Sequence, residues 1–281
     1  MRLTTILLST LLFISCGSEK PVPVTDQNQS FDQFKERFID AFWEMNPGWA
    51  SAVGNHKYDA VIKLPNEASR LEAIAFANAY LDSLSGFNEN ELNPLDRCDL
   101  YMIRDHLKSE IWYTETFKSW SWNPSTYNLG ESFALILNGR HASLNERIRT
   151  MAKRMESVSE YYEAAQANIS DPTLSHTQMG ISRNKGTLDV FGPSMIDSVD
   201  ASDLSETEKH DLLANIEIAK SAISEYIDFL EKTVLPSVED SARDFRIGKE
   251  LYAQKFDHDI QSSYSADEVY GKALEAKYDL L

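Results

Sequence analysis

The sequence predicts an all-α fold, in which long helices pack in antiparallel pairs and strands are few or absent. Three observations support this prediction. Apolar residues recur at helical spacing in the long segments, helix-capping patterns precede several of them, and no segment shows the sustained alternation that is typical of a strand. Packing long helices side by side in a multi-helix array buries the apolar stripe of each one.

The first three expected helices lie in the N-terminal half. Ser30 with Gln33 resembles a capping box and starts the first helix, and Pro47-Gly48 ends it. Its apolar face repeats at helical spacing, through Phe31, Phe34, Phe38, Phe42 and Met45. The second helix covers 66–85 and stops at Gly86, and Asn93-Pro94 begins a third that reaches about Trp120.

Three further helices are expected behind Ser-x-x-Glu capping boxes. Ser143 with Glu146 starts a helix that reaches Ile169, and Ser205 with Glu208 starts one that reaches Leu235, before Pro236. Ser265 with Glu268 starts the last helix. That helix runs into Leu280-Leu281 with no capping glycine or proline after it, so we expect the fold to be an incomplete domain.

Composition excludes two classes of protein. The 281 residues are 42% hydrophobic and 11% aromatic, too apolar for a disordered chain. Lys plus Arg number 27 against 44 for Asp plus Glu, which gives a net charge of −17. A nucleic-acid partner is therefore not expected, because binding phosphates requires clustered basic residues.

The N-terminus has the pattern of a secretory signal. Arg2 precedes an apolar run that ends at Ile14 and is too short to span a bilayer. The following Ser15-Cys16-Gly17-Ser18 resembles a bacterial lipobox, with Phe13 where leucine is usual, and this resemblance implies lipidation of Cys16. A plain secretory signal with an incidental cysteine is the alternative.

This pattern predicts the domain organisation and the location. Residues 1–15 form the lipoprotein signal peptide, 16–30 a flexible tether and 31–281 the helical body. The lipid anchor makes a membrane of the bacterial cell envelope the expected partner, on its periplasmic face or at the cell surface. Lipidation of Cys16 leaves Cys98 without a disulfide partner, and we expect Cys98 to be a buried core residue.

Metal and catalytic motifs are absent from the sequence. The six histidines are never three to five residues apart, and HExxH does not occur. The dense group Asp257-His258-Asp259 is expected to form a solvated acidic face, because adjacent residues of a helix point in different directions. Neither a nucleophile elbow nor a phosphate-binding loop is present. We therefore predict no catalytic residue, no metal ligand and no cofactor in this chain.

An aromatic turn between helices is the most informative local motif. Trp120, Trp122 and Tyr127 surround Asn123-Pro124. Their rings either close the helical core as a plug, the commoner arrangement, or line a groove that binds peptide or glycan.

Several segments in order resemble one family. The segment Asn46-Pro47-Gly48-Trp49-Ala50-Ser51-Ala52-Val53-Gly54-Asn55-His56-Lys57-Tyr58-Asp59 is similar to the opening motif of bacterial proteins in the domain of unknown function 885 family. The turn around Trp122-Asn123-Pro124, the segment 147–169 and the block Phe245-Arg246-Ile247-Gly248-Lys249-Glu250-Leu251-Tyr252 resemble later parts of the same family. The resemblance covers the chain from residue 31 onward.

This resemblance implies a mostly helical, zinc-metallopeptidase-like protein in which an HExxH helix supplies zinc ligands and a general base. No position of this chain matches HExxH, so no catalytic or zinc-binding residue is carried over. We expect the chain to be the N-terminal helical half of such a membrane-anchored protein, inactive alone, with zinc and a peptide substrate implied only for the full-length form. The alternative is a non-catalytic lipoprotein that binds peptide or glycan through the aromatic turn.

Overall fold

Helices make up every regular element that the structure describes. The computed structural model describes residues 26–239 and 243–280, where one isolated β-bridge joins Thr173 to Arg243. This confirms the all-α prediction. The predicted signal peptide, Cys16 and most of the predicted tether lie outside the described residues. Within those residues, no helix combines the length and the hydropathy needed to cross a bilayer.

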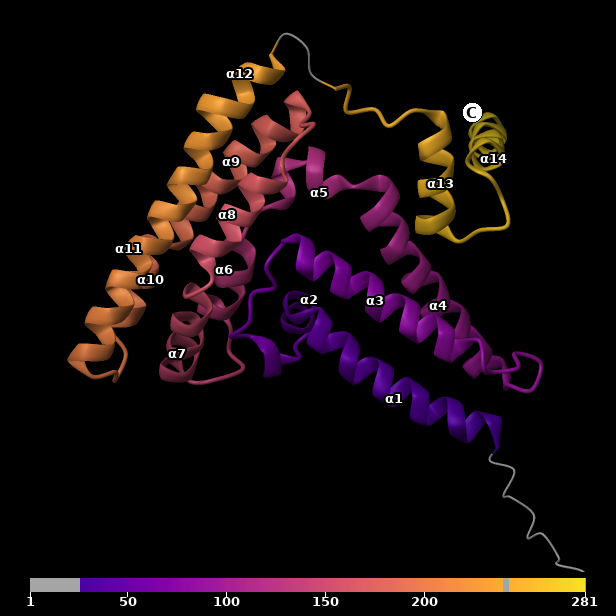
Figure 1. Cartoon of the computed structure of the whole chain (residues 1–281), viewed down its shortest axis with the longest axis horizontal. Coiled ribbons are helices and arrows are strands. Elements are labelled where there is room, and N and C mark those ends of the chain that lie inside the picture. The colour runs from indigo at the N-terminus through magenta and orange to yellow at the C-terminus, as the bar shows by residue number, and fades with distance from the viewer. Residues whose placement is uncertain (1–25, 240–242, 281) are drawn as a thin grey trace, which may run out of the picture.

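Three helices surround a smaller apolar core. They are α1 (Gln27–Met45), α3 (Glu67–Leu84) and α4 (Pro94–Trp112) (Figure 1). The phenylalanine face predicted for α1 is buried in this core; the rings of Phe31, Phe34 and Phe38 stack along the helix, and that of Phe42 is tilted against Phe38. The expected start at Ser30 is wrong. Asp26 caps the helix by accepting a hydrogen bond from the Asn28 N–H, so the helical body begins inside the predicted tether.

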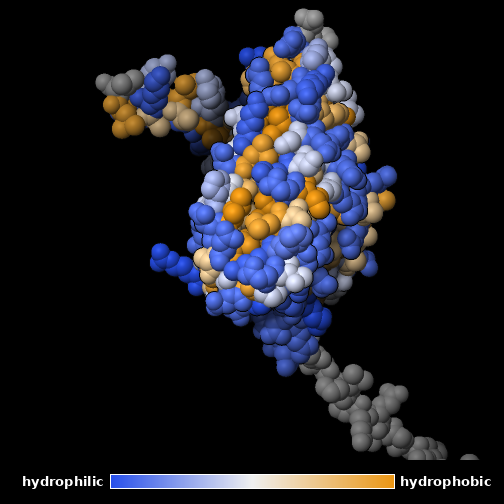
Figure 2. Space-filling view, turned by 90° about the vertical axis from the view of Figure 1, so that its left-hand side faces the viewer, coloured by the Kyte–Doolittle hydropathy of each residue, from blue (hydrophilic) through white to orange (hydrophobic). Residues whose placement is uncertain are grey.

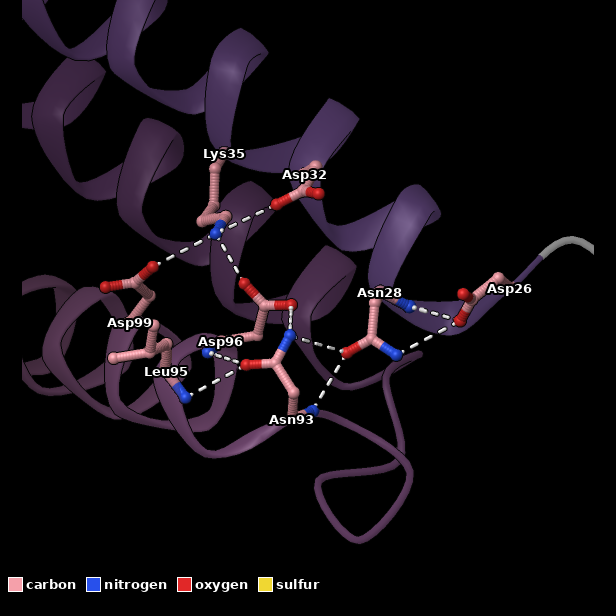
Figure 3. Close-up of polar contacts among 8 residues, drawn as sticks. All are labelled: Asp26, Asn28, Asp32, Lys35, Asn93, Leu95, Asp96 and Asp99. Atoms are coloured by element: carbon pink, nitrogen blue, oxygen red, sulfur yellow. Dashed lines mark hydrogen bonds and ion pairs between the residues drawn. The ribbon is translucent and has the colours of Figure 1, made fainter.

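A polar network joins the N-terminal ends of α1 and α4 (Figure 3). Asn93 caps α4 by accepting from the Leu95 and Asp96 N–H groups, as predicted. Its side chain also contacts Asn28 of α1. The Lys35 ammonium group of α1 lies 3.0 Å from both Asp32 and Asp99 and also contacts Asp96. These contacts fix how α1 and α4 cross.

Short elements connect the two cores. α2 (Pro47–Ala52) and the 3₁₀ turn η1 (His56–Tyr58) follow α1, whereas the π-helical turn η2 (Tyr113–Phe117) follows α4. The third predicted helix therefore ends before Trp120. Lys118 adopts a left-handed conformation (φ 51°), which ends the helix. The chain changes direction there and continues as α5 (Ser119–Trp122). The 3₁₀ turn η3 (Pro124–Thr126) completes this connection.

The larger core is built by the helices that follow this connection. They are α6 (Gly130–Asn138), α7 (Leu144–Met155), α8 (Val158–Asn168), α9 (Leu174–Val190), α10 (Pro193–Asp200) and α11 (Glu206–Phe229). The capping boxes predicted for α7 and α11 are both present. The helix predicted over 143–169 is two helices, because Glu156 and Ser157 form a turn between α7 and α8.

Helical structure continues through Pro236, where an end was expected. A π-helical turn, η4 (Leu230–Val234), follows α11, and α12 (Leu235–Val238) contains the proline in its first turn. The first turn of a helix does not need the N–H that proline lacks, so the register change in η4 lets the helical course continue.

Two further helices form an arm. α13 (Lys249–Ile260) packs on α4, and α14 (Ala266–Asp279) follows the predicted capping box of Ser265 and Glu268. Neither helix contains a buried residue. Figure 2 shows α14, which is seen end-on in Figure 1, projecting sideways from the body with hydrophobic and hydrophilic residues exposed along it.

Cys98 is exposed, so the prediction of a buried cysteine is wrong. The buried face of α4 is formed by Asp96, Leu100 and Leu107, and Cys98 lies outside this face. The helical periodicity of α4 therefore places the thiol toward solvent.

Candidate functional site

A cleft lies on one side of α13, between this helix and residues of η2, α5 and α9. Its volume is about 810 Å³, within the range of small-molecule binding sites. One wall comes from the body and is formed by Phe117, Trp122 and His176. The other comes from the segment that enters α13 and from α13 itself, and is lined by Phe245, Arg246, Ile247, Gly248, Lys249, Tyr252, Lys255, Phe256, Asp259 and Ile260.

The body wall of the cleft is aromatic and internally braced. The Trp122 ring lies edge-on to those of Phe117 and His176, with centroids 5.2 and 5.3 Å apart. Its indole N–H donates to the Phe117 carbonyl at 2.9 Å. Burial lowers the pKa of His176, whose Nδ1 lies 2.6 Å from the Thr173 hydroxyl. This wall is therefore apolar and uncharged near neutral pH.

A charged group lies along the opposite wall. Lys255 and the Tyr113 hydroxyl both contact the carboxylate of Asp259. Burial opposes charging the Lys255 ammonium, yet its hydrogen bonds to Asp259 and Tyr113 hold its pKa above the usual value. Burial also opposes ionisation of Asp259, but the same two partners hold the pKa of its carboxyl below the usual value. The pair is therefore charged at neutral pH.

Glycine is required where the chain enters α13. Gly248 precedes α13 at φ 80°, a conformation that side chains disfavour, although a methyl group added there would meet no atom within 4 Å. Five residues earlier, the Arg243 guanidinium lies 4.9 Å from the centroid of the Trp122 ring. These two features help to position the segment 243–248, of which residues 245–248 line the cleft.

The three residues of the predicted binding turn have different environments. Tyr127 is buried and donates to the Trp120 carbonyl, and its ring packs in the larger core. Trp120 is half-buried, with Arg70 stacked 4.0 Å from its ring centroid. Trp122 is also buried, although it is the one member of the three that lines the cleft. Binding of peptide or glycan by this turn stays a prediction.

Within Asp257-His258-Asp259, the last two residues have separate partners. Asp259 contacts Lys255 and Tyr113, as described above, whereas His258 Nδ1 lies 3.1 Å from the Ser109 hydroxyl. The His258 ring also packs on Trp112, with centroids 4.8 Å apart. The contacts of His258 attach α13 to α4.

A second polar cluster was missed by the sequence analysis. His56, Asp59 and His141 place one ligand atom each within 4.8 Å of one another, and theirs is the one such group found in the described ranges. His56 and Asp59 are three residues apart, a spacing that could have drawn attention to them. Nothing in the sequence indicates that His141, in the loop between α6 and α7, lies against them.

Comparison with known proteins assigns the family. The sequence model of a family described as "Bacterial protein of unknown function (DUF885)" matches residues 47–280. The chain belongs to the DUF885 family. Two segments of the DUF885 resemblance carry the features described above: 46–59 contains His56 and Asp59, and 245–252 forms part of the cleft wall.

One solved structure shows the wider context of the DUF885 fold. A predicted lipoprotein of unknown function from Shewanella oneidensis is 39% identical to this chain, with a TM-score of 0.85. The match covers 89% of this chain but 46% of the Shewanella protein, so this chain spans about half the length of that relative. A search of the curated proteins found no match.

Proposed function

We propose that this chain is the N-terminal helical portion of a membrane-anchored, metallopeptidase-like DUF885 protein, in which it forms one wall of a long substrate cleft. The observation that carries this proposal is the coverage of the Shewanella relative, 46% of which corresponds to this chain. The chain alone is expected to have no peptidase activity. The zinc that the family resemblance implies has no matching ligands here, because HExxH is absent, and no step of such a reaction is assigned to this chain.

The arm supplies the surface on which the rest of the DUF885 fold would pack. Tyr270 and Tyr278 of α14 are 66% and 73% exposed, and their spacing of eight residues places them toward one side of the helix. Together with Leu274, which lies between them, they form an apolar stripe on α14, a helix that has no buried residue in this chain. We propose that this stripe packs against the part of the DUF885 fold that corresponds to the unmatched remainder of the Shewanella protein.

Reconstitution tests this assignment. The unmatched remainder of the Shewanella protein is expressed separately and mixed with this chain, and the complex is measured by analytical ultracentrifugation. Changing Tyr270 and Tyr278 together to Ser should weaken the complex at least about tenfold, because two large apolar side chains leave the interface. The matched control changes Glu275 and Asp279, toward the other side of α14, to Ser. Equal effects of both double variants, or no complex with the unchanged chain, would contradict the proposal.

The DNA that follows the last codon gives a second test. An HExxH coding sequence there, in any reading frame, supports the metallopeptidase-like assignment. An unrelated gene, together with a purified chain that is monomeric and cooperatively folded, would contradict it.

The second candidate is a non-catalytic lipoprotein that binds peptide or glycan at the aromatic turn. The position of Trp122 on the cleft wall is the observation that favours it. Fluorescence titration with peptide and oligosaccharide libraries would detect such binding. Trp122→Phe should lower the affinity of a ligand that occupies the cleft, whereas Trp43→Phe, in the smaller core, should leave it unchanged.

A further inference from the structure

The second cluster joins two segments that are distant in the sequence. His56 begins η1 and Asp59 follows it, after a turn at Gly54 with φ 90°. His141 lies in the loop that links α6 to α7. Gly139 in that loop allows the ring to fold back, since a methyl group there would lie 2.8 Å from His141 Nδ1. The backbone of both segments therefore positions the cluster.

The three side chains meet at one carboxylate oxygen. Asp59 Oδ2 lies 2.9 Å from His56 Nδ1 and 3.2 Å from His141 Nε2. The two imidazole rings are stacked, with centroids 3.5 Å apart and planes 8° apart. Both rings thus present a nitrogen to the same side of the cluster.

These separations are close to those of a metal-binding site. Zinc binds histidine nitrogen and carboxylate oxygen at about 2.0–2.2 Å, which places tetrahedral ligand atoms roughly 3.3–3.5 Å apart. To admit an ion, the nitrogen–oxygen distances of 2.9 and 3.2 Å lengthen by only a few tenths of an ångström, and the two stacked rings tilt so that the lone pair of each nitrogen points at the ion. Partial exposure of the His56 and His141 side chains, 33% and 19%, permits that movement and leaves room for a water ligand.

The carboxylate of Asp59 gives a second, independent observation that points to a ligand. The residue is 3% exposed, and its second carboxylate oxygen, Oδ1, is buried without a hydrogen-bond partner among the described residues. A buried carboxylate normally has its oxygens satisfied, because leaving one unpaired is costly. Both histidines contact Oδ2, His56 through a hydrogen bond and His141 at 3.2 Å, and these contacts leave Oδ1 unexplained.

Arg154 of α7 is the charged neighbour of the cluster. Its Nη1 donates to the Asp59 backbone carbonyl at 2.6 Å, and its guanidinium lies 5.7 Å from the centroid of the Phe133 ring. The arginine therefore anchors the Asp59 backbone rather than pairing with its carboxylate oxygens. Its positive charge reduces the affinity for a cation without occupying a ligand atom.

We propose that His56, Asp59 and His141 bind a divalent first-row transition metal ion, zinc in particular, with water at the fourth position. Two imidazole nitrogens favour such an ion over calcium or magnesium, which prefer oxygen ligands. The ion would link the η1 segment to the α6–α7 loop. This site shares no residue with the HExxH zinc site implied for the full-length family. A failure of the metal-binding proposal would therefore leave the proposed function unaffected, and the reverse also holds.

Metal titration of the full-length chain tests the site. The chain is purified without a histidine tag, metal is removed with a chelator, and Co²⁺ is added while visible absorption is recorded. We expect one Co²⁺ per chain with the intense bands of a four-coordinate site, and displacement by Zn²⁺. Zn²⁺ should also raise the melting temperature of the chain.

Matched variants locate the ion. His56→Gln, Asp59→Asn and His141→Gln should each weaken Zn²⁺ binding at least about tenfold, since each removes one of three protein ligands. His258→Gln, beside two aspartates on α13, is the control and should bind as the unchanged chain does. Because His56 and His141 are partly exposed, their variants should keep the melting temperature of the metal-free chain. Absence of Co²⁺ binding, or equal loss in His258→Gln, would overturn the proposal.

Discussion

The ammonium group of Lys35 on α1 lies 2.5 Å from the carboxylate of Asp96 in the first turn of α4. Asp96 is 4% exposed, whereas the Lys35 side chain is 25% exposed. This ion pair and its neighbours Asp32 and Asp99 connect the ends of two helices that pack around the smaller core (Figure 3).

Lys35→Met should lower the free energy of unfolding by about 2 kcal/mol, because it leaves the buried Asp96 carboxylate without its cation while the partly exposed pair limits the loss. Urea denaturation followed by circular dichroism measures the change. Lys108→Met, at an exposed position of α4, is the control and should change the free energy by less than about 0.5 kcal/mol. Equal losses would mean that the ion pair contributes nothing.

The same pair predicts how stability depends on alkaline pH. Burial opposes the charge of Lys35, but its hydrogen bonds to Asp96, Asp32 and Asp99 hold its pKa above the usual value. A raised lysine pKa contributes stability that is full below the unfolded pKa of about 10.4 and is lost as pH rises through the folded value. The stability difference between the unchanged chain and Lys35→Met should therefore be constant from pH 7 to 9 and should shrink above about pH 10.4. A difference that shrinks below pH 9 would contradict this assignment.

Gly130→Ala should destabilise the larger core by about 1–3 kcal/mol through overpacking. A methyl group at Gly130 would lie 2.7 Å from Thr187 Oγ1, which accepts a 2.7 Å hydrogen bond from Asn128. Thermal melting measures the effect. Gly186→Ala, in the interior of α9 with nothing within 4 Å of the added methyl group, should instead stabilise the chain by about 0.5–1 kcal/mol.

Asn184→Ala should destabilise the chain by about 3 kcal/mol, because this fully buried amide holds the aromatic turn against α9. It donates to the carbonyls of Tyr127 and Gly180 and accepts from the Tyr162 hydroxyl. Asn78→Ala removes an exposed amide that bonds only within its own helix, to Ile74, and should be nearly neutral. Chemical denaturation of both variants compares them, and similar losses would show that the network is dispensable.

The same residue shows what the sequence could and could not reveal. Helices with local signals were predictable, since Ser205 and Glu208, or Ser265 and Glu268, are close in the chain and cap independently of the fold. The spacing of apolar residues does not predict α9, because the buried face of this helix is partly polar, at Thr177, Asn184 and Thr187. An apolar period cannot detect a helix that is held by buried hydrogen bonds.

The candidate sites were harder to predict than the helices, because their residues come together from distant parts of the chain. Trp122 could be selected as an unusual aromatic residue in a turn, but the opposite wall of its cleft comes from α13, far along the chain. Likewise His56 and Asp59 meet His141 only through the packing of η1 against the loop after α6. A single sequence contains no record of such long-range contacts, because each depends on how helices pack rather than on spacing.

The attachment of α13 gives the cleft a mechanical property. The Trp112 indole of α4 donates to Gln254 of α13 at 3.0 Å, which attaches one wall to a helix that packs around the smaller core. His176, on the other wall, belongs to α9, a helix that packs around the larger core. A molecule that contacts both walls of the cleft would therefore be held by residues attached to both cores, and we expect it to link them.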